Sequence, residues 1–137
     1  MRNGFKYEME LKVRDYECDI QGIVNNANYQ HYLEHTRHEF LSTNNVSFSE
    51  LHLHGIDAVV SRVEIQYKSP LHPDDAFVSC LNVQKQGVKY VFNQAIFRKS
   101  DNVVCIKAKV EIVVLIDGRL SKGIEAFDKL TESYRYS

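Results

Sequence analysis

The segment NYQHYLEHTRHEFLST, residues 28–43, carries an apolar stripe at helical spacing in a chain that otherwise alternates. The stripe consists of Tyr29, Tyr32, Leu33, Phe40 and Leu41, with Thr36 and Arg37 on the same face. Apolar residues three and four positions apart predict an amphipathic helix. The residues suited to cap its N-terminus are Asn25, Asn26 and Asn28. We therefore expect one long helix that buries a single face against the rest of the protein.

Both flanks of this helix predict β-strands. Residues 5–15 alternate between apolar and charged side chains, which is the period of a half-buried strand. A short helix is predicted over 47–54, and from residue 57 onward four strands are separated by turns at 69–75, 86–87 and 100–102. The tail at 122–132 predicts one more short helix. Because short turns join antiparallel neighbours, we expect an α+β protein with a five-stranded antiparallel sheet on one long helix.

A sheet of this size also predicts self-association. One helix cannot cover both faces of five strands or seal the two sheet edges, which otherwise present unpaired backbone groups. We therefore expect a homo-oligomer.

The composition excludes several classes of protein. In 137 residues, 17 Lys and Arg stand against 18 Asp and Glu, so the net charge of −1 is not that of a general nucleic-acid binder. No apolar run approaches the roughly 20 residues that span a bilayer, and the alternating N-terminus is unlike a signal peptide. The cysteines, Cys18, Cys80 and Cys105, form no CxxC pair. We expect a cytoplasmic protein with free thiols, no metal site and no membrane span.

The loop before the long helix carries the candidate chemistry. In DIQGIVNNANY, residues 19–29, the carboxylate of Asp19 comes seven positions before Asn26, and Gly22 lets the backbone bend or approach a ligand. A helix start offers unpaired N–H groups and the positive end of the helix dipole. Such amides stabilise an oxyanion while a carboxylate acts as base or nucleophile, which suits acyl transfer. The alternative is that Asp19 only shapes the turn.

At these residues the chain resembles a known family. An Asp, a Gly three positions on, two aliphatic residues and an Asn-Tyr entering a helix resemble the 4-hydroxybenzoyl-CoA thioesterases of the hotdog superfamily, including the Tol–Pal-associated acyl-CoA thioesterases. A Tyr-x-Glu-x-x-Arg run in the helix and a later Ile-x-Tyr-x-x-Pro followed by two aspartates are also similar. The matching positions are Asp19, Gly22, Ile23, Val24, Asn28, Tyr29, Tyr32, Glu34, Arg37, Ile65, Tyr67, Pro70, Asp74 and Asp75. The resemblance covers roughly residues 7–116.

The resemblance implies a single hotdog domain over residues 1–137, in which the sheet wraps the helix and two subunits pair their sheets. It implies hydrolysis of a small or medium acyl-CoA, with no metal or redox cofactor, at sites between the subunits of a homodimer or homotetramer. By position, Asp19 is the catalytic base or nucleophile, and the backbone N–H near Asn26 polarises the carbonyl. The implied substrate-binding positions are Gly22, Ile23, Val24 and Tyr29.

Three rival functions stay open. Residues 24–29, VNNANY, resemble a stretch of acyl-ACP thioesterases, but those enzymes carry Asn and His at the positions of Gln21 and Ile23. A hotdog dehydratase or hydratase needs a His with a carboxylate, and the Asp19 loop has none. A non-catalytic acyl-CoA-binding protein is the third rival. Many relatives of the resembled family carry His or Tyr at Asn26, whose side chain cannot act as a general acid or base.

Three other patterns predict ordinary surface or packing roles. His31, Glu34 and His35 match an inverted zincin motif but predict a solvated helix face. Glu34 is expected to pair with Arg37, three residues along the helix. Cys18, with no neighbouring His in the sequence, is expected to be an inert thiol.

Overall fold

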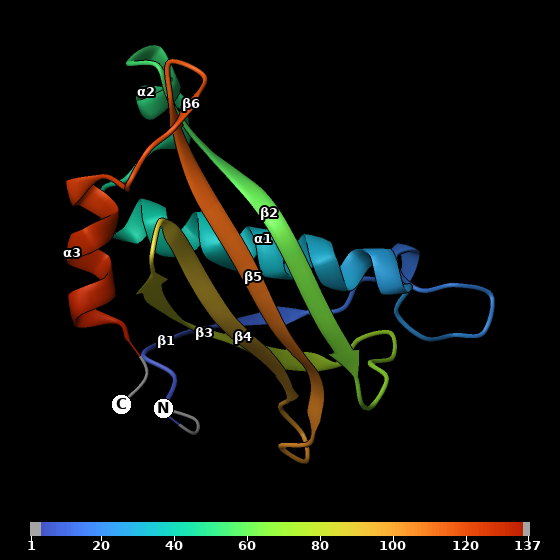
Figure 1. The fold of residues 1–137 in the computed structure, drawn as a ribbon. Helices are drawn as coiled ribbons and strands as arrows, with labels where there is room; N and C mark the ends of the chain where they lie inside the picture. The colour runs from blue at the N-terminus through green and yellow to red at the C-terminus, as the bar shows by residue number, and fades with distance from the viewer. Residues whose placement is uncertain (1–3, 136–137) are drawn as a thin grey trace.

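A curved antiparallel sheet and one long helix that crosses its inner face make up most of the molecule (Figure 1). The computed structural model describes residues 4–135. The strands are β1 (Tyr7–Lys12), β2 (Ile56–Tyr67), β3 (Ala76–Gln86), β4 (Lys89–Arg98), β5 (Val104–Ile116) and β6 (Arg119–Leu120). They follow the order β1-β3-β4-β5-β2, all antiparallel, with the short β6 paired to β5. The predicted α+β class and five-stranded sheet are confirmed, and β6 is an addition to them.

The helices begin where the sequence supplies capping side chains. They are α1 (Asn26–Thr43), α2 (Phe48–Leu53) and α3 (Glu125–Ser133), preceded by the 3₁₀ turn η1 (Asp15–Glu17). Of the three candidate asparagines, Asn25 caps α1: its Oδ1 accepts the Ala27 N–H at 2.9 Å. Ser47 caps α2, since its hydroxyl accepts the Glu50 N–H at 3.3 Å. None of the described helices is both long and apolar enough to cross a membrane.

The predicted stripe of α1 packs onto the sheet in two hydrophobic clusters. Tyr29, Tyr32 and Leu33 belong to the cluster nearer the N-terminal end of the helix, with Phe77 at its centre. The second cluster lies nearer the C-terminal end, with Phe40 and Leu41 of α1, and includes Phe127 and Leu130 of α3. Burying large side chains of this kind contributes about 1.5–3 kcal/mol each. These clusters hold the two ends of α1 on the sheet.

A polar seam separates the two clusters under the middle of α1, and consists of Thr36, Arg37, Ser79 and Gln94. The hydroxyls of Thr36 and Ser79 are 2.7 Å apart, and Arg37 Nη1 donates to Gln94 Oε1 at 3.0 Å. Gln94 Nε2 in turn donates to the Leu33 carbonyl at 3.1 Å. All four side chains are buried, so the seam crosses the core as a hydrogen-bonded band.

Strand β2 forms a free edge of the sheet and leaves apolar side chains uncovered. Val60, Val63 and Tyr67 line cavities beside α1, yet 48, 40 and 47% of their surfaces are exposed. A register shift between Val60 and Arg62 marks a bulge, which interrupts the period of two in the first half of the strand. An edge strand of this length with exposed apolar residues is a site where another chain pairs.

Candidate active site

A tight loop carries Asp19 ahead of α1 and projects beyond the N-terminal end of the helix (Figure 1). Its base is closed by the bridge between Cys18 and Val24, and the Asp19 N–H donates to the Ile23 carbonyl at 2.9 Å. Gly22 turns the chain with φ of 76°, a left-handed conformation that favours glycine. Asp19 Oδ1 accepts the Gln21 N–H at 2.8 Å. Asp19 therefore shapes the turn through Oδ1, and no partner for Oδ2 is found among residues 4–135.

The buried carboxylate of Glu17 ties this loop to α1. Its Oε1 accepts the Arg14 N–H and the Tyr32 hydroxyl, both at 2.8 Å, and its Oε2 accepts Arg14 Nη2 at 3.2 Å. Its backbone carbonyl accepts the Asn25 N–H and the Asn28 side-chain amide. Burial acts to raise the pKa of Glu17, but these donors outweigh it and hold the pKa below its ordinary value. Glu17 is thus an ionised anchor between the Asp19 loop and the start of the helix.

Replacing Glu17 with Gln is expected to lower the free energy of unfolding by about 1.5–3 kcal/mol, since hydrogen bonds to a charged group are lost. The folded-state pKa lies below the ordinary value of 4.5, so this contribution is complete above pH 4.5 and is lost as the pH falls through the lowered folded-state value. Urea unfolding of both proteins across a pH series measures it. The exposed Glu39 on α1, changed to Gln, is the matched control. A stability gap that stays constant at acid pH contradicts an ionised Glu17.

A cavity of about 240 Å³ opens at the start of α1. Four of the six predicted site residues line it: Ile23, Val24, Asn26 and Tyr29. The remaining lining residues come from the end of β2 and the turn after it: Tyr67, Lys68, Ser69 and Pro70. Asp19 and Gly22 are not among the lining residues. One chain therefore gathers Asn26 and three of the four predicted binding residues, but leaves Gly22 and the predicted carboxylate of Asp19 on the projecting loop.

The backbone amide at the start of α1 is a candidate oxyanion donor. Asn26 is the first helical residue, where an N–H has no partner within the helix. The next two amides are occupied, Ala27 by the Asn25 side chain and Asn28 by the Asn25 carbonyl. Within residues 4–135, no acceptor is found for the Asn26 N–H. Asn26 lines the cavity, and its N–H lies at the positive end of the helix dipole, which favours negative charge.

Tyr29 and Val24 serve the core as well as the cavity wall. Both are buried, and the Tyr29 hydroxyl accepts the Leu71 N–H at 3.0 Å. Burial raises the pKa of Tyr29, so its phenol stays protonated. The Tyr29 ring meets the Tyr67 ring edge to face at 5.7 Å. Tyr29 and Val24 therefore both pack in the core and line the cavity.

The far wall of the cavity was not assigned from sequence, although the Ile-x-Tyr-x-x-Pro motif pointed to it. Arg98 holds this wall from β4: its Nη2 donates to the Pro70 carbonyl at 2.6 Å and its Nη1 to Asp101 at 2.7 Å. Nothing in the motif itself indicates that the turn after β2 faces the start of α1. That placement depends on the antiparallel pairing of β2 with β5.

Cys18 lies beside Asp19 but is a poor nucleophile. Burial raises the pKa of its thiol, and the neighbouring carboxylate of Asp19 raises it further. A reactive cysteine needs the opposite shift, because the thiolate is the attacking species. The predicted inert thiol agrees with this environment.

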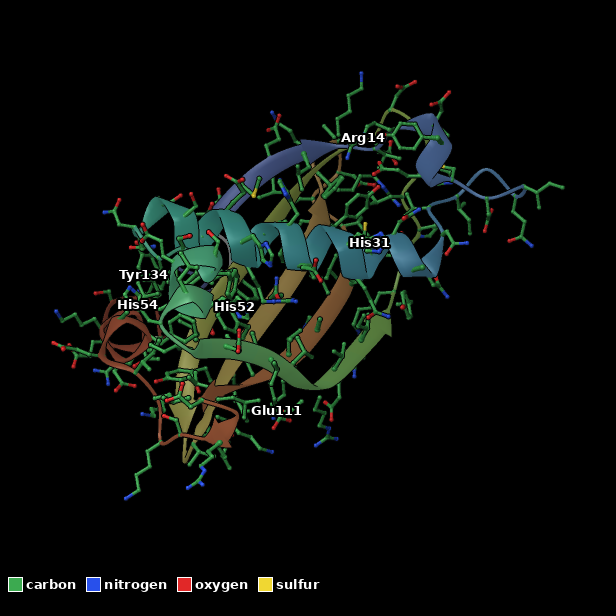
Figure 2. The ribbon with its side chains drawn as sticks, turned by 90° about the horizontal axis from the view of Figure 1, so that it is seen from above. Arg14, His31, His52, His54, Glu111 and Tyr134 are labelled. Carbon is green, nitrogen blue, oxygen red and sulfur yellow. The ribbon has the colours of Figure 1, made fainter. Side chains whose placement is uncertain are left out.

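A trough lies alongside α1, adjacent to this region. It comprises two adjoining cavities of about 390 and 480 Å³ between α1 and β2, which share Glu34, Arg37 and Val60. Figure 2 shows the direction of α1, with Arg14 near its N-terminal end, and with His52 of α2 and the C-cap residue His54 near its other end. The trough therefore extends from the first turn of α1 toward α2.

The predicted ion pair between Glu34 and Arg37 is wrong. Arg37 is 7% exposed and turns inward to Gln94, whereas Glu34 is exposed, and no ion pair joins them in the described part of the chain. Helical spacing allowed the pair, but the amide of Gln94 on β4 offers a buried acceptor that the spacing does not reveal. Burial lowers the pKa of Arg37 to about 10, with Glu34 acting in the opposite direction.

Comparison with known proteins identifies the family and the fold. Residues 13–130 match the family described as the thioesterase-like superfamily. The chain is 35% identical over 114 residues to the acyl-acyl carrier protein thioesterase ATL3 of Arabidopsis thaliana, covering 82% of this chain and 60% of that protein. It is 28% identical over 132 residues to the long-chain acyl-CoA thioesterase FadM of Escherichia coli, covering 89 and 99%. The crystal structure of Slr0204, a 1,4-dihydroxy-2-naphthoyl-CoA thioesterase from Synechocystis, superposes with a TM-score of 0.87 at 12% identity, over 96 and 98% of the two chains.

Proposed function

The chain belongs to the thioesterase-like superfamily with the hotdog fold, and on that premise we propose that it hydrolyses a small or medium acyl-CoA to the free acid and CoA. The observation that carries the proposal is the cavity at the start of α1, where the unpaired Asn26 amide meets residues of the Asp19 loop. The chain spans about 60% of the length of the plant relative, so its substrate is proposed rather than taken from that enzyme. Membership of the family supports the reaction class, and the cavity supports placing the reaction at the start of α1.

In the proposed reaction the thioester carbonyl lies against the Asn26 N–H. Asp19 either takes a proton from the water that attacks the carbonyl carbon, or attacks that carbon itself to give a mixed anhydride that water then hydrolyses. In both routes the carbon–sulfur bond breaks, CoA leaves with the sulfur, and the Asn26 amide stabilises the oxyanion. Loss of one such donor lowers kcat by roughly 10²–10³.

We propose that the working site needs a second copy of the chain. Asp19 lies outside the cavity of its own chain, and the free edge of β2 leaves one side of the trough open. Ile20 is fully exposed on the projecting loop, and Tyr16 of η1 is 74% exposed, with the Arg14 guanidinium over its ring at 5.6 Å. A two-fold pair of edge strands covers the same surface on both copies. A homodimer, alone or within a homotetramer, is the proposed assembly.

An acyl-ACP thioesterase is the second candidate, favoured by the similarity to the plant acyl-ACP enzyme. Both carriers present the same phosphopantetheine thioester, so the cavity accepts either in principle. The carrier protein itself would lie outside the cavity. An acyl-ACP would therefore differ from an acyl-CoA only in what its carrier contacts at the protein surface.

The experiment is the release of free thiol from matched acyl-CoA and acyl-ACP panels. Turnover that favours the CoA series supports the proposal, and turnover that favours the ACP series selects the second candidate. Binding of these thioesters without release of thiol overturns both and identifies an acyl-thioester-binding protein. For each acyl chain length, the same acyl group on the other carrier is the internal control.

A further inference from the structure

The trough beside α1 begins at Ala27, next to Asn26 of the cavity at the helix start. Its helical side consists of Ala27, Gln30, His31, Glu34, Arg37 and His38, which recur every three or four positions on one face. Across from them lie Val60 and Val63 of β2 and Val110 of β5. Asn26 and Arg37 are eleven positions apart, or about 16 Å along the helix axis. The trough therefore offers an acyl chain a path away from the Asn26 amide, with valines on the sheet side and mostly polar side chains on the helix side.

A buried positive charge lies where the two cavities of the trough adjoin. Arg37 lines both cavities of the trough, yet it is buried, and its side-chain partner among the described residues is the neutral amide of Gln94. The other acidic residue of the trough, Asp57, is 2.7 Å from His52 and occupied by it. The carboxylate of Glu34 lines the same two cavities and acts on Arg37 through its charge, but no hydrogen bond or ion pair joins the two side chains in the part of the chain that the structure describes. The remaining donors of the guanidinium are therefore available to a further acceptor in the trough.

We propose that Arg37 binds an oxygen acceptor on the acyl chain, so that the preferred substrate is an acyl thioester bearing a carboxylate or other oxygen several carbons from the thioester. The inference rests on the proposed function in taking the ligand to be an acyl thioester. It adds the chemistry of the far end of the chain. The Arg37 side chain leans toward the helix N-terminus, as long helical side chains do, which brings the guanidinium closer to the thioester end.

The seam explains why a carboxylate suits this position. A guanidinium presents five donors in a planar fork that matches two carboxylate oxygens. Gln94 occupies Nη1 and is itself fixed by its bond to the Leu33 carbonyl. The guanidinium is thus held in one orientation before the ligand arrives. An unsubstituted alkyl chain of the same length would place methylene groups against this charge and leave the donors unmet.

The test compares pairs of thioesters that differ only at the far end: hexanoyl-CoA with adipoyl-CoA, octanoyl-CoA with suberoyl-CoA, and decanoyl-CoA with sebacoyl-CoA. For at least one pair, kcat/KM of the wild type is expected to favour the carboxylate-bearing member. In Arg37→Met that preference is expected to fall by about 10- to 100-fold, the worth of a charged hydrogen bond. Arg37→Lys keeps the charge and retains part of the preference. Arg119→Met, on the exposed β6, is the matched control with wild-type rates.

Equilibrium binding of the same pairs to Asp19→Asn, measured by calorimetry, separates this inference from the proposed function. If no thioester is turned over but the carboxylate-bearing member binds more tightly, the proposed function fails and the Arg37 site stands. If the wild type shows no preference in any pair, or Arg37→Met keeps it, the Arg37 site is overturned. Dissociation of the oligomer in Arg37→Met with an unchanged preference also overturns it, and assigns the missing acceptor to a second copy of the chain.

Discussion

Asp19→Asn is expected to lower kcat for thioester hydrolysis by about 10²–10⁴, the usual contribution of a positioned general base. The substitution removes the charge but keeps an oxygen at the position of Oδ1, which accepts the Gln21 N–H at 2.8 Å. The turn over residues 19–23 is therefore expected to survive, and the melting temperature to stay close to that of the wild type. Thiol release and thermal unfolding of the same preparation measure the two effects.

The matched control for this experiment is Asp74→Asn. Asp74 is exposed on another loop, with a weak contact to Lys12 at 3.7 Å, and its φ of 68° is one that asparagine tolerates. It removes one carboxylate from the chain surface without touching the cavity. Unchanged turnover in Asp19→Asn would keep the reaction class but remove Asp19 from it. Glu34 would then be the carboxylate to replace, because it lines the trough.

Val60→Lys combined with Val63→Lys is expected to convert the assembly to a monomer of 15.9 kDa. Both side chains are at least 40% exposed in the single chain, so the substitutions cost the fold little. In a two-fold pair they would place like charges against each other at the edge of β2. Each 1.4 kcal/mol lost from the interface weakens association about tenfold. Sedimentation at several protein concentrations measures the mass.

Activity is expected to fall with the mass, since the proposed site needs both copies. Leu120→Lys is the matched control, because Leu120 is exposed on β6, away from the free edge of β2. A monomer with full turnover would show that one chain holds the whole site. An oligomer that persists in the double variant would place the interface on another surface.

Local patterns were sufficient to predict much of the fold. The stripe of α1 and its asparagine cap follow from spacing alone, and both are in the structure, although the helix starts at Asn26 rather than residue 28. The first half of β2 was harder to predict from the sequence, because the bulge before Arg62 breaks the alternation of apolar and polar residues. The two-residue β6 is too short to show a period.

The site was predicted less completely, for reasons of tertiary placement. Asn26 and Tyr29 line the same cavity because a helix fixes their relation to each other, and that relation could be predicted from their spacing. The inward turn of Arg37 depends on Gln94, 57 residues away in the sequence, and helical spacing carries no information about it. The relation of Asp19 to the cavity depends in our proposal on a second chain, so no pattern within one sequence predicts its distance from the substrate.

The polar seam separates the core into two sets of residues with different roles. One hydrophobic cluster supports the Asp19 loop and the cavity, and the other anchors α3 and the far end of the helix. Substitutions that alter what the enzyme accepts are expected to collect in the first set, and those that alter heat resistance in the second. Because the seam keeps most side chains of the two sets apart, substrate specificity can change during evolution with little effect on thermal stability.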